Sequence, residues 1–134
     1  MLEGNKNRVS PSYEELTPGY EFPPASYELS ISLISKYLKA VDSRSDGFVP
    51  PLAIAAYAMT AVSKSLILPP GSIHASQELE FLKLVPIGTR VNCKAKVARK
   101  LTRGQMRMLT LELNVWDESG DMAQSGKATV ILPA

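Results

Sequence analysis

The sequence is poor in the two residues that most often build disulfides and metal centres. Its 134 residues include one cysteine, Cys93, and one histidine, His74. A single cysteine cannot form a disulfide within the chain, and one cysteine with one histidine is too few for a Cys/His zinc site. We therefore expect neither a metal ion nor a cofactor.

The sequence also lacks a long apolar run and a strong surplus of charge. No stretch reaches the roughly 20 apolar residues of a membrane-spanning helix, and the start of the chain is too polar for a signal peptide. A net charge of +2 does not indicate a nucleic-acid partner. We expect one cytoplasmic domain that binds neither membrane nor nucleic acid, with residues 1–12 as a flexible tail and residues 13–134 as the domain.

What is present is one unusually apolar helical stretch at residues 48–66. Ten of the eleven residues from 52 to 62 are apolar, and five of these are alanines. Pro51 suits the first helical turn, and Pro69, Pro70 and Gly71 end the element. A helix that is apolar on nearly every face must be covered by protein. The pattern thus predicts a central helix enclosed on all sides, in which enlarging Ala56 to leucine would overpack the core.

The other segments predict a short helix and an antiparallel sheet. Residues 25–29 are typical of a short edge strand, and Ser30 can cap an amphipathic helix over residues 31–41. After the central helix the apolar period changes to two, which predicts half-buried strands near residues 73–81, 90–97, 109–115 and 122–132. In the first of these, Ile73, Ala75, Leu79 and Phe81 would face the core. The fold class is α+β, with the sheet wrapped around the central helix.

Residues 68–91 carry a resemblance to a known family. A Pro-Pro-Gly turn is followed by a strand that ends in Phe81 and then by Pro-Ile-Gly at residues 86–88. This segment resembles MaoC-like proteins of the hot-dog superfamily, and the resemblance extends from residues 17–19 to residues 126–133. It implies a hot-dog dimer with acyl-thioester ligands, either acyl-CoA or acyl-ACP. It also implies hydration of a 2-enoyl thioester or the reverse dehydration.

The sequence departs from the family where such hydratases carry out their chemistry. They are expected to use an aspartate after the first helix and, a few residues on, a histidine within an Asn-Pro-x-His sequence. Asp42 matches the aspartate, but residues 43–47 contain neither histidine nor Asn-Pro. Pro51 stands where a glycine N–H would hold the thioester carbonyl. The resemblance therefore implies a degenerate, non-catalytic or partner-dependent subunit, paired as a homodimer or with a MaoC-like hydratase chain.

Candidate site residues follow from the residues and from the resemblance. Asp42 and His74 are the candidates for catalysis, although Asp42 is otherwise a capping residue and His74 a solvated or ion-paired one. Arg99, Lys100 and Arg103 surround one hairpin, where they either meet the phosphates of coenzyme A or are simply solvated. The candidates for substrate contacts lie at the start of the central helix: Val49, Pro51, Leu52, Ala53, Ile54 and Tyr57.

Two alternative functions stay open beside the degenerate subunit. One is an independent (R)-specific enoyl-CoA hydratase or 3-hydroxyacyl dehydratase with an unrecognised set of catalytic groups. The other is a hot-dog acyl-CoA thioesterase, which usually needs a carboxylate on or just before the central helix. Residues 51–66 contain no carboxylate, which weighs against a thioesterase unless Asp42 or Asp46 reaches the site.

Overall fold

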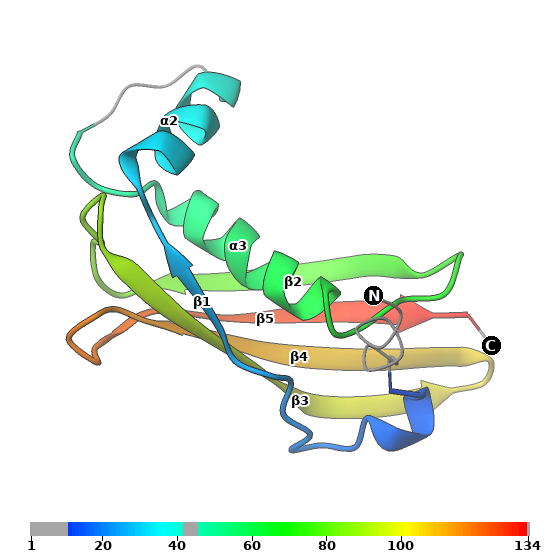
Figure 1. Ribbon diagram of the computed structural model, residues 1–134. Coiled ribbons are helices and arrows are strands. Elements are labelled where there is room, and N and C mark those ends of the chain that lie inside the picture. Colours follow the sequence, from blue (N-terminus) through cyan, green and yellow to red (C-terminus); the bar gives the residue numbers. More distant parts are fainter. Residues whose placement is uncertain (1–10, 42–45, 134) are drawn as a thin grey trace, which may run out of the picture.

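One antiparallel sheet and two α-helices make up the computed structural model, which describes residues 11–41 and 46–133 (Figure 1). Asp42 and residues 1–10 of the predicted tail lie outside the described residues. The elements in chain order are the 3-10 helix η1 (Tyr13–Glu15), β1 (Ala25–Glu28), α2 (Ile31–Ala40), α3 (Pro51–Ser63), β2 (Ile73–Phe81), β3 (Arg90–Arg103), β4 (Met106–Trp116) and β5 (Met122–Leu132). The strand order is β1-β3-β4-β5-β2, and every pairing is antiparallel. The predicted α+β class is confirmed.

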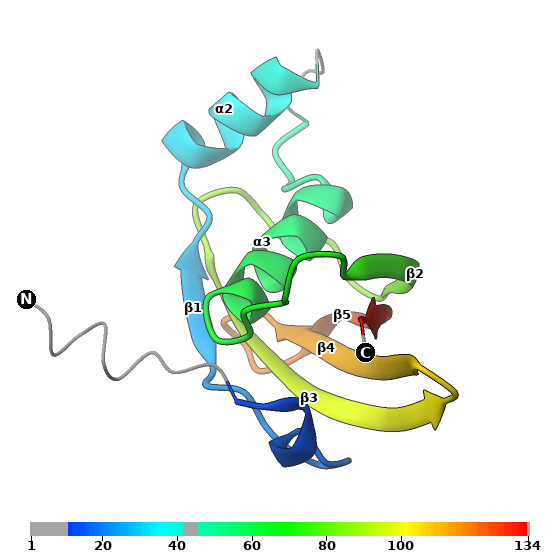
Figure 2. The same ribbon diagram turned by 90° about the vertical axis from the view of Figure 1, so that its right-hand side faces the viewer.

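The core lies between α3 and the concave face of the sheet (Figure 2). Along β4, and along β3 as far as Val97, the residues alternate as predicted, with every second side chain buried in the core. The sheet contributes Val91, Cys93, Ala95, Val97, Leu109, Leu111, Leu113 and Val115, and α3 contributes Ala53, Ile54, Ala55, Ala58 and Val62. The alanines allow the helix to lie close to the strands, as the sequence indicated.

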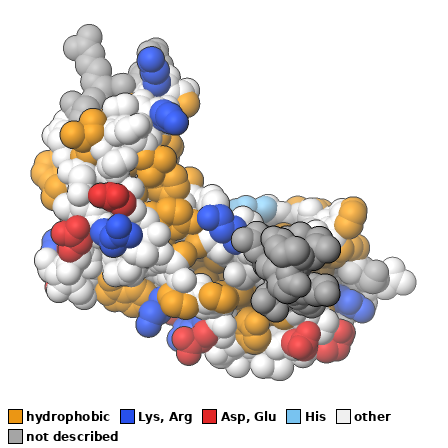
Figure 3. Space-filling model, viewed as in Figure 1, with side chains coloured by type: hydrophobic (Ala, Val, Ile, Leu, Met, Phe, Trp, Pro, Cys, Tyr) orange, Lys and Arg blue, Asp and Glu red, His pale blue; other side chains and the backbone are white. Residues whose placement is uncertain are grey.

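The prediction that α3 is covered on all sides is wrong for the described chain. Leu52 is 59% exposed, and Ala56 and Thr60 on the same side of the helix are exposed as well. The sheet curves around one side of α3, and α2 stands beyond the end of the helix instead of covering its outer side (Figures 1 and 2). Figure 3 shows the resulting L-shaped outline, with apolar side chains in the angle of the L. A larger side chain at Ala56 would therefore point to solvent and would not overpack the core, contrary to the prediction.

α2 follows the predicted boundaries but buries only part of its apolar face. Ser30 caps it by accepting a hydrogen bond from the Leu33 N–H at 3.2 Å. Ile34 and Leu38 are buried, whereas Ile31 at the start and Val41 just after the helix are more than half exposed. The two buried residues hold the helix to the rest of the chain.

A β-bulge in β2 changes which side chains face α3. His74 pairs with Val130 and Ser76 with Thr129, so Ala75 is an extra residue without a partner. His74 consequently shares the helix side of the sheet with the buried Val130, and Ile73 turns to the outer side. The sequence predicted the opposite arrangement, with Ile73 facing the core and buried. Every residue of β2 is exposed, and β2 is an edge strand of the sheet.

Candidate functional site

The segment before α3 is held in place by the loop at residues 85–87. Val49 donates to the Val85 carbonyl at 2.7 Å, and Ile87 donates to the Gly47 carbonyl at 3.1 Å. Pro50 is the N-cap and Pro51 the first helical residue, so neither offers an N–H group. The Ala53 N–H donates to the Pro50 carbonyl at 2.9 Å. Among the described residues, the N–H of Leu52 is therefore the one in the first turn that has no partner.

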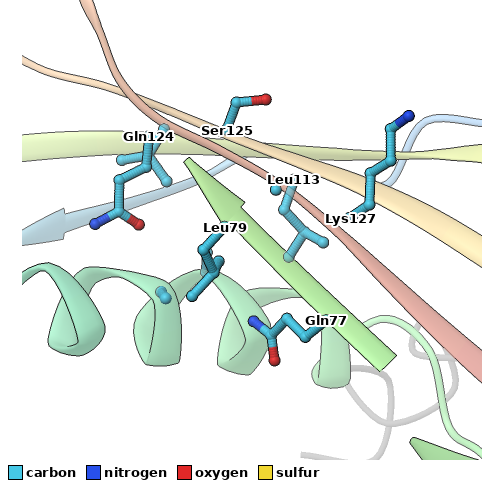
Figure 4. A pocket seen from close by; sticks show the side chains of 10 residues that line it. Gln77, Leu79, Leu113, Gln124, Ser125 and Lys127 are labelled. Atoms are coloured by element: carbon cyan, nitrogen blue, oxygen red, sulfur yellow. The ribbon is translucent and has the colours of Figure 1, made fainter. Parts of the chain in front are cut away.

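A buried glutamine from the sheet anchors this first turn. Gln124 of β5 is 3% exposed, and its Nε2 donates to the Pro51 carbonyl at 2.7 Å. Figure 4 shows Gln124 and Gln77 reaching from neighbouring strands toward α3. Sequence reasoning missed Gln124, because its place in the strand is recognisable only once the register is known. The amide fixes the position of the helix N-terminus over the sheet.

The recess beside Gln124 is narrow. It lies between α3 and strands β2, β4 and β5, with walls that include Ala55, Ala58, Leu79 and Leu113. Its enclosed volume of about 10 Å³ is close to the space that one water molecule needs. An acyl chain does not fit between α3 and the sheet unless the two move apart.

The predicted substrate-contacting residues do not surround one common cavity. Val49, Ala53 and Ile54 are buried in the core, and Leu52 faces solvent. Pro51 is partly buried at the helix start. Tyr57 lies on the β1 side of α3, where its ring stacks on that of Tyr27 with centroids 5.5 Å apart. The helix start thus offers one exposed strip, centred on Leu52, as its accessible surface.

His74 is far from the start of α3. It pairs with Val130, whereas Phe81 at the other end of β2 pairs with Gln124, which contacts Pro51. Along β5 the two pairing positions are six residues apart, which corresponds to about 20 Å along a strand. Within one chain, the histidine and the helix N-terminus are therefore at opposite ends of the sheet.

A buried carboxyl group, that of Asp117, lies at the same end of the sheet as the start of α3, and it forms an ion pair. Asp117, in the turn between β4 and β5, contacts the Lys83 ammonium, which also lies 2.8 Å from Asp121. The hydrogen bond from Lys83 lowers the pKa of Asp117, and the Asp117 and Asp121 carboxylates raise the pKa of Lys83. Both groups stay charged at neutral pH, so Asp117 has no proton to give.

The three basic candidates lie on different faces of the sheet. In β3, Val97 pairs with Leu111 and Arg99 with Thr110, so Ala98 is an extra residue that reverses the alternation. Lys100 therefore turns to the helix side, where its Nζ donates to the Tyr13 carbonyl at 2.6 Å. Arg99 lies on the outer side with Leu101 and Met108, and Arg103 ends the strand at the hairpin. These residues do not form one cluster.

Comparisons with known proteins bear on the fold. No protein-family model matches the sequence, and no curated protein matches it. The solved structures that match include the (R)-hydratase from A. caviae involved in PHA biosynthesis, with a TM-score of 0.76, 20% identity, and coverage of 90% of this chain and 99% of that one. A MaoC-like dehydratase from Rhodospirillum rubrum has a TM-score of 0.76, 19% identity, and coverage of 90% and 94%.

A third similar structure is a two-component assembly. The ChsH1-ChsH2 complex from Mycobacterium tuberculosis matches with a TM-score of 0.71, 13% identity, and coverage of 87% of this chain and 98% of that one. The chain thus has the hot-dog fold, and its structural neighbours include MaoC-like dehydratases and (R)-hydratases, as the sequence predicted. Among the described residues, no helix is long and apolar enough to cross a membrane.

Proposed function

We propose that the chain is a MaoC-like acyl-thioester-binding domain that acts in the cytoplasm and has no hydratase activity alone. It serves as the degenerate, partner-dependent half of an enoyl-thioester hydratase or dehydratase. The fold shared with hydratases supports the lineage. The observation that carries the proposal is the distance of about 20 Å along the sheet between His74, the chain's one histidine, and the start of α3.

The groups described at the start of α3 can hold a carbonyl but cannot transfer a proton. Adding water to a double bond requires a group that removes a proton and one that returns it. The Gln124 amide and the Leu52 N–H do neither at neutral pH, and Asp117 is occupied by Lys83. Asp46 accepts a hydrogen bond from the Phe48 N–H at 3.0 Å, and His74 is too far away to act as its partner. Asp42, outside the described residues, would be a lone carboxylate. General acid–base help is typically worth about 10²–10⁴-fold, so its loss brings the rate close to background.

The proposed thioester lies along the exposed side of α3. Its carbonyl oxygen accepts from the Leu52 N–H, where the positive end of the helix dipole favours negative charge. The acyl chain lies beside Leu52 and Ala56 instead of in the narrow recess under the helix. Arg103 is the basic candidate left to meet the phosphates, because Lys100 already donates to Tyr13 and Arg99 lies on the outer side of the sheet.

A second chain with an intact aspartate–histidine pair would supply the chemistry. The ChsH1-ChsH2 complex shows that this fold occurs in an assembly of two different components. The exposed side of α3 and the free edge of β2 are the surfaces that a second chain could cover. A homodimer is the alternative when the chain is expressed alone.

The decisive experiment is a hydratase assay on the purified chain with crotonyl-CoA and with a longer 2-enoyl-CoA. We expect a rate near background for both. Turnover of about ten per second, the median of characterised enzymes, that disappears in Asp42→Ala would refute the proposal and establish an independent hydratase. Co-expression with a MaoC-like chain that carries the intact pair should give an active complex.

A titration tests binding separately from catalysis. Calorimetry with a long-chain acyl-CoA should show binding that weakens with added salt, because exposed charges are screened beyond roughly 8 Å at physiological ionic strength. Arg103→Ala should weaken binding, whereas Lys39→Ala on α2 is the matched control and should not. No binding by the single chain, together with tight binding by the complex, would assign the pocket to the partner and overturn the proposed thioester site on α3.

A further inference from the structure

A second and larger recess lies at the opposite end of α3. It is formed where η1, the segment after α3 and the ends of β4 and β5 meet, and its volume is about 360 Å³. Small-molecule sites typically have about 300–1,000 Å³. The walls are mostly apolar, and Arg107 is the one charged residue in the part of them that the structure describes. The apolar part includes Leu16, Leu66, Leu68, Leu132 and Pro133.

The wall formed by η1 is held rigidly in place. The Tyr13 hydroxyl donates to the Leu101 carbonyl at 3.3 Å and lies 3.0 Å from Thr102 Oγ1. The Tyr13 carbonyl accepts from Lys100 at 2.6 Å. Leu16, directly after η1, is buried. These contacts tie η1 to β3 and fix this wall of the recess.

Positive charge beside this wall has no partner of opposite sign. The Lys100 Nζ is 4.2 Å and the Arg107 Cζ 5.3 Å from the centre of the Tyr13 ring. Among the described residues, neither cation is within ion-pair distance of a carboxylate, since the ion pairs involve Lys83 and Lys96. Lys100 donates to a carbonyl, whereas no hydrogen bond of the Arg107 guanidinium is found in the described part of the chain. An anion is the group that this end of the recess lacks.

The geometry of the Arg107 guanidinium favours a carboxylate as the anion. A guanidinium matches the two oxygens of a carboxylate with two parallel hydrogen bonds. Arg107 is the single cation among the described residues that line the recess, and it balances one negative charge. The remaining walls are hydrocarbon, which requires an apolar body on the ligand. A monoanion with an alkyl chain satisfies both conditions.

We propose that this recess binds an unesterified long-chain carboxylate. The carboxylate meets Arg107, and the alkyl chain packs against Leu16, Leu66 and Leu132. The recess is distinct from the place of the thioester carbonyl, because the 13 residues of α3, about 20 Å of helix, separate the two ends. Its ligand is a free acid and not a thioester.

The test is calorimetry of the full chain with dodecanoate. We expect saturable binding of one molecule per chain, and a loss of about tenfold or more in Arg107→Gln, as for a hydrogen bond to a charged group. Arg107→Lys should fall between the two, because lysine keeps the charge without the paired donors. Lys39→Gln on α2 removes one charge elsewhere and should bind like the wild type. Dodecanol, with the same chain and no charge, should bind the wild type as weakly as dodecanoate binds Arg107→Gln.

A second variant tests the apolar part without touching the charge. Leu68→Trp fills the recess from its partly exposed rim, and it should abolish binding while the melting temperature stays near that of the wild type. Equal affinity in Arg107→Gln and wild type, or no saturable binding to the wild type, would overturn the proposal. Binding only after removal of residues 1–10 would also overturn it, because the chain itself would then occupy the recess.

Discussion

At the scale of single residues, Cys93 is a core side chain and not a reactive thiol. It is buried under α3, and burial raises the pKa of its thiol to about 11. Because the thiolate is the reactive form, we expect a thiol reagent at pH 8 to modify the native protein slowly and the unfolded protein rapidly. Rapid labelling of one thiol per folded chain would show that α3 does not seal this part of the core.

The Lys83–Asp117 pair predicts how stability depends on pH. The pKa of Asp117 is lowered from its ordinary value of 3.8, chiefly by the hydrogen bond from Lys83. A carboxyl with a lowered folded-state pKa stabilises the fold above its unfolded pKa and loses that contribution as pH falls through the folded value. The free energy of unfolding should therefore decrease as pH falls below 3.8. Chemical denaturation measured from pH 5 down to about pH 2 checks this.

Two variants assign the acid-side effect to the pair. Asp117→Asn and Lys83→Met should each flatten this part of the pH profile. On the alkaline side, the pKa of Lys83 is raised above 10.5, chiefly by its hydrogen bond with Asp117, so its contribution is lost only as pH rises beyond that value. A wild-type profile that Asp117→Asn leaves unchanged would show that the acid sensitivity originates elsewhere.

At the scale of elements, α3 has a packed side and an open side. Ala58 is buried against the sheet, and Ala56 is exposed. Ala58→Leu should overpack the core and lower the free energy of unfolding by about 1–3 kcal/mol. Ala56→Leu should change it by less than about 0.5 kcal/mol, as is usual at a surface position. Denaturation curves compare the two, and equal losses would mean that the open side is covered in solution.

The sequence predicted the elements well and the exact faces of the strands less well. Period-two alternation identified the buried side of β4 correctly, because that strand carries no extra residue. The bulges add Ala75, Ala98 and Ala123 to their strands. Alanine fits either an apolar or a polar position, so a count of alternating residues passes over it without a break. His74 was therefore assigned to the wrong face, and the sequence did not predict that Lys100 turns to the helix side.

The candidate site could be predicted only in part, because some of its contacts depend on the register of the strands. The two prolines at the start of α3 and the lack of a nearby histidine are visible in the sequence. The Gln124 anchor and the charged wall at Tyr13 depend on contacts between residues 73 and 87 positions apart. Such contacts exist only once the strand register is set, and no local pattern encodes them.

At the scale of the whole molecule, the free edge of β2 predicts self-association. β2 is unpaired on one side, and its apolar residues Ile73, Leu79 and Phe81 are exposed. An exposed edge with apolar side chains is a template for pairing with another strand, and closed twofold pairing is the common solution. We expect a dimer in analytical ultracentrifugation at micromolar concentration. Phe81→Lys should shift it toward the monomer.

The matched control places the same charge on another exposed apolar residue. Ile31→Lys, at the start of α2, should leave the dimer intact, because α2 lies away from the β2 edge (Figure 1). A wild-type chain that sediments as a monomer at micromolar concentration would exclude the β2 edge as an assembly surface. Dissociation by Ile31→Lys instead would move the interface to α2.

The bulge at Ala75 also limits how far any strand can be added to this edge. Beyond the bulge, β2 offers one regular ladder from Ser76 to Phe81, which is about 20 Å long. An incoming strand meets a twisted backbone at Ala75 and cannot continue its pairing in the same register. The opposite edge of the sheet is the four-residue β1. A sheet with one short edge and one interrupted edge can close into a pair but is poorly suited to grow into a fibre, so a single inserted alanine helps to protect this chain against aggregation.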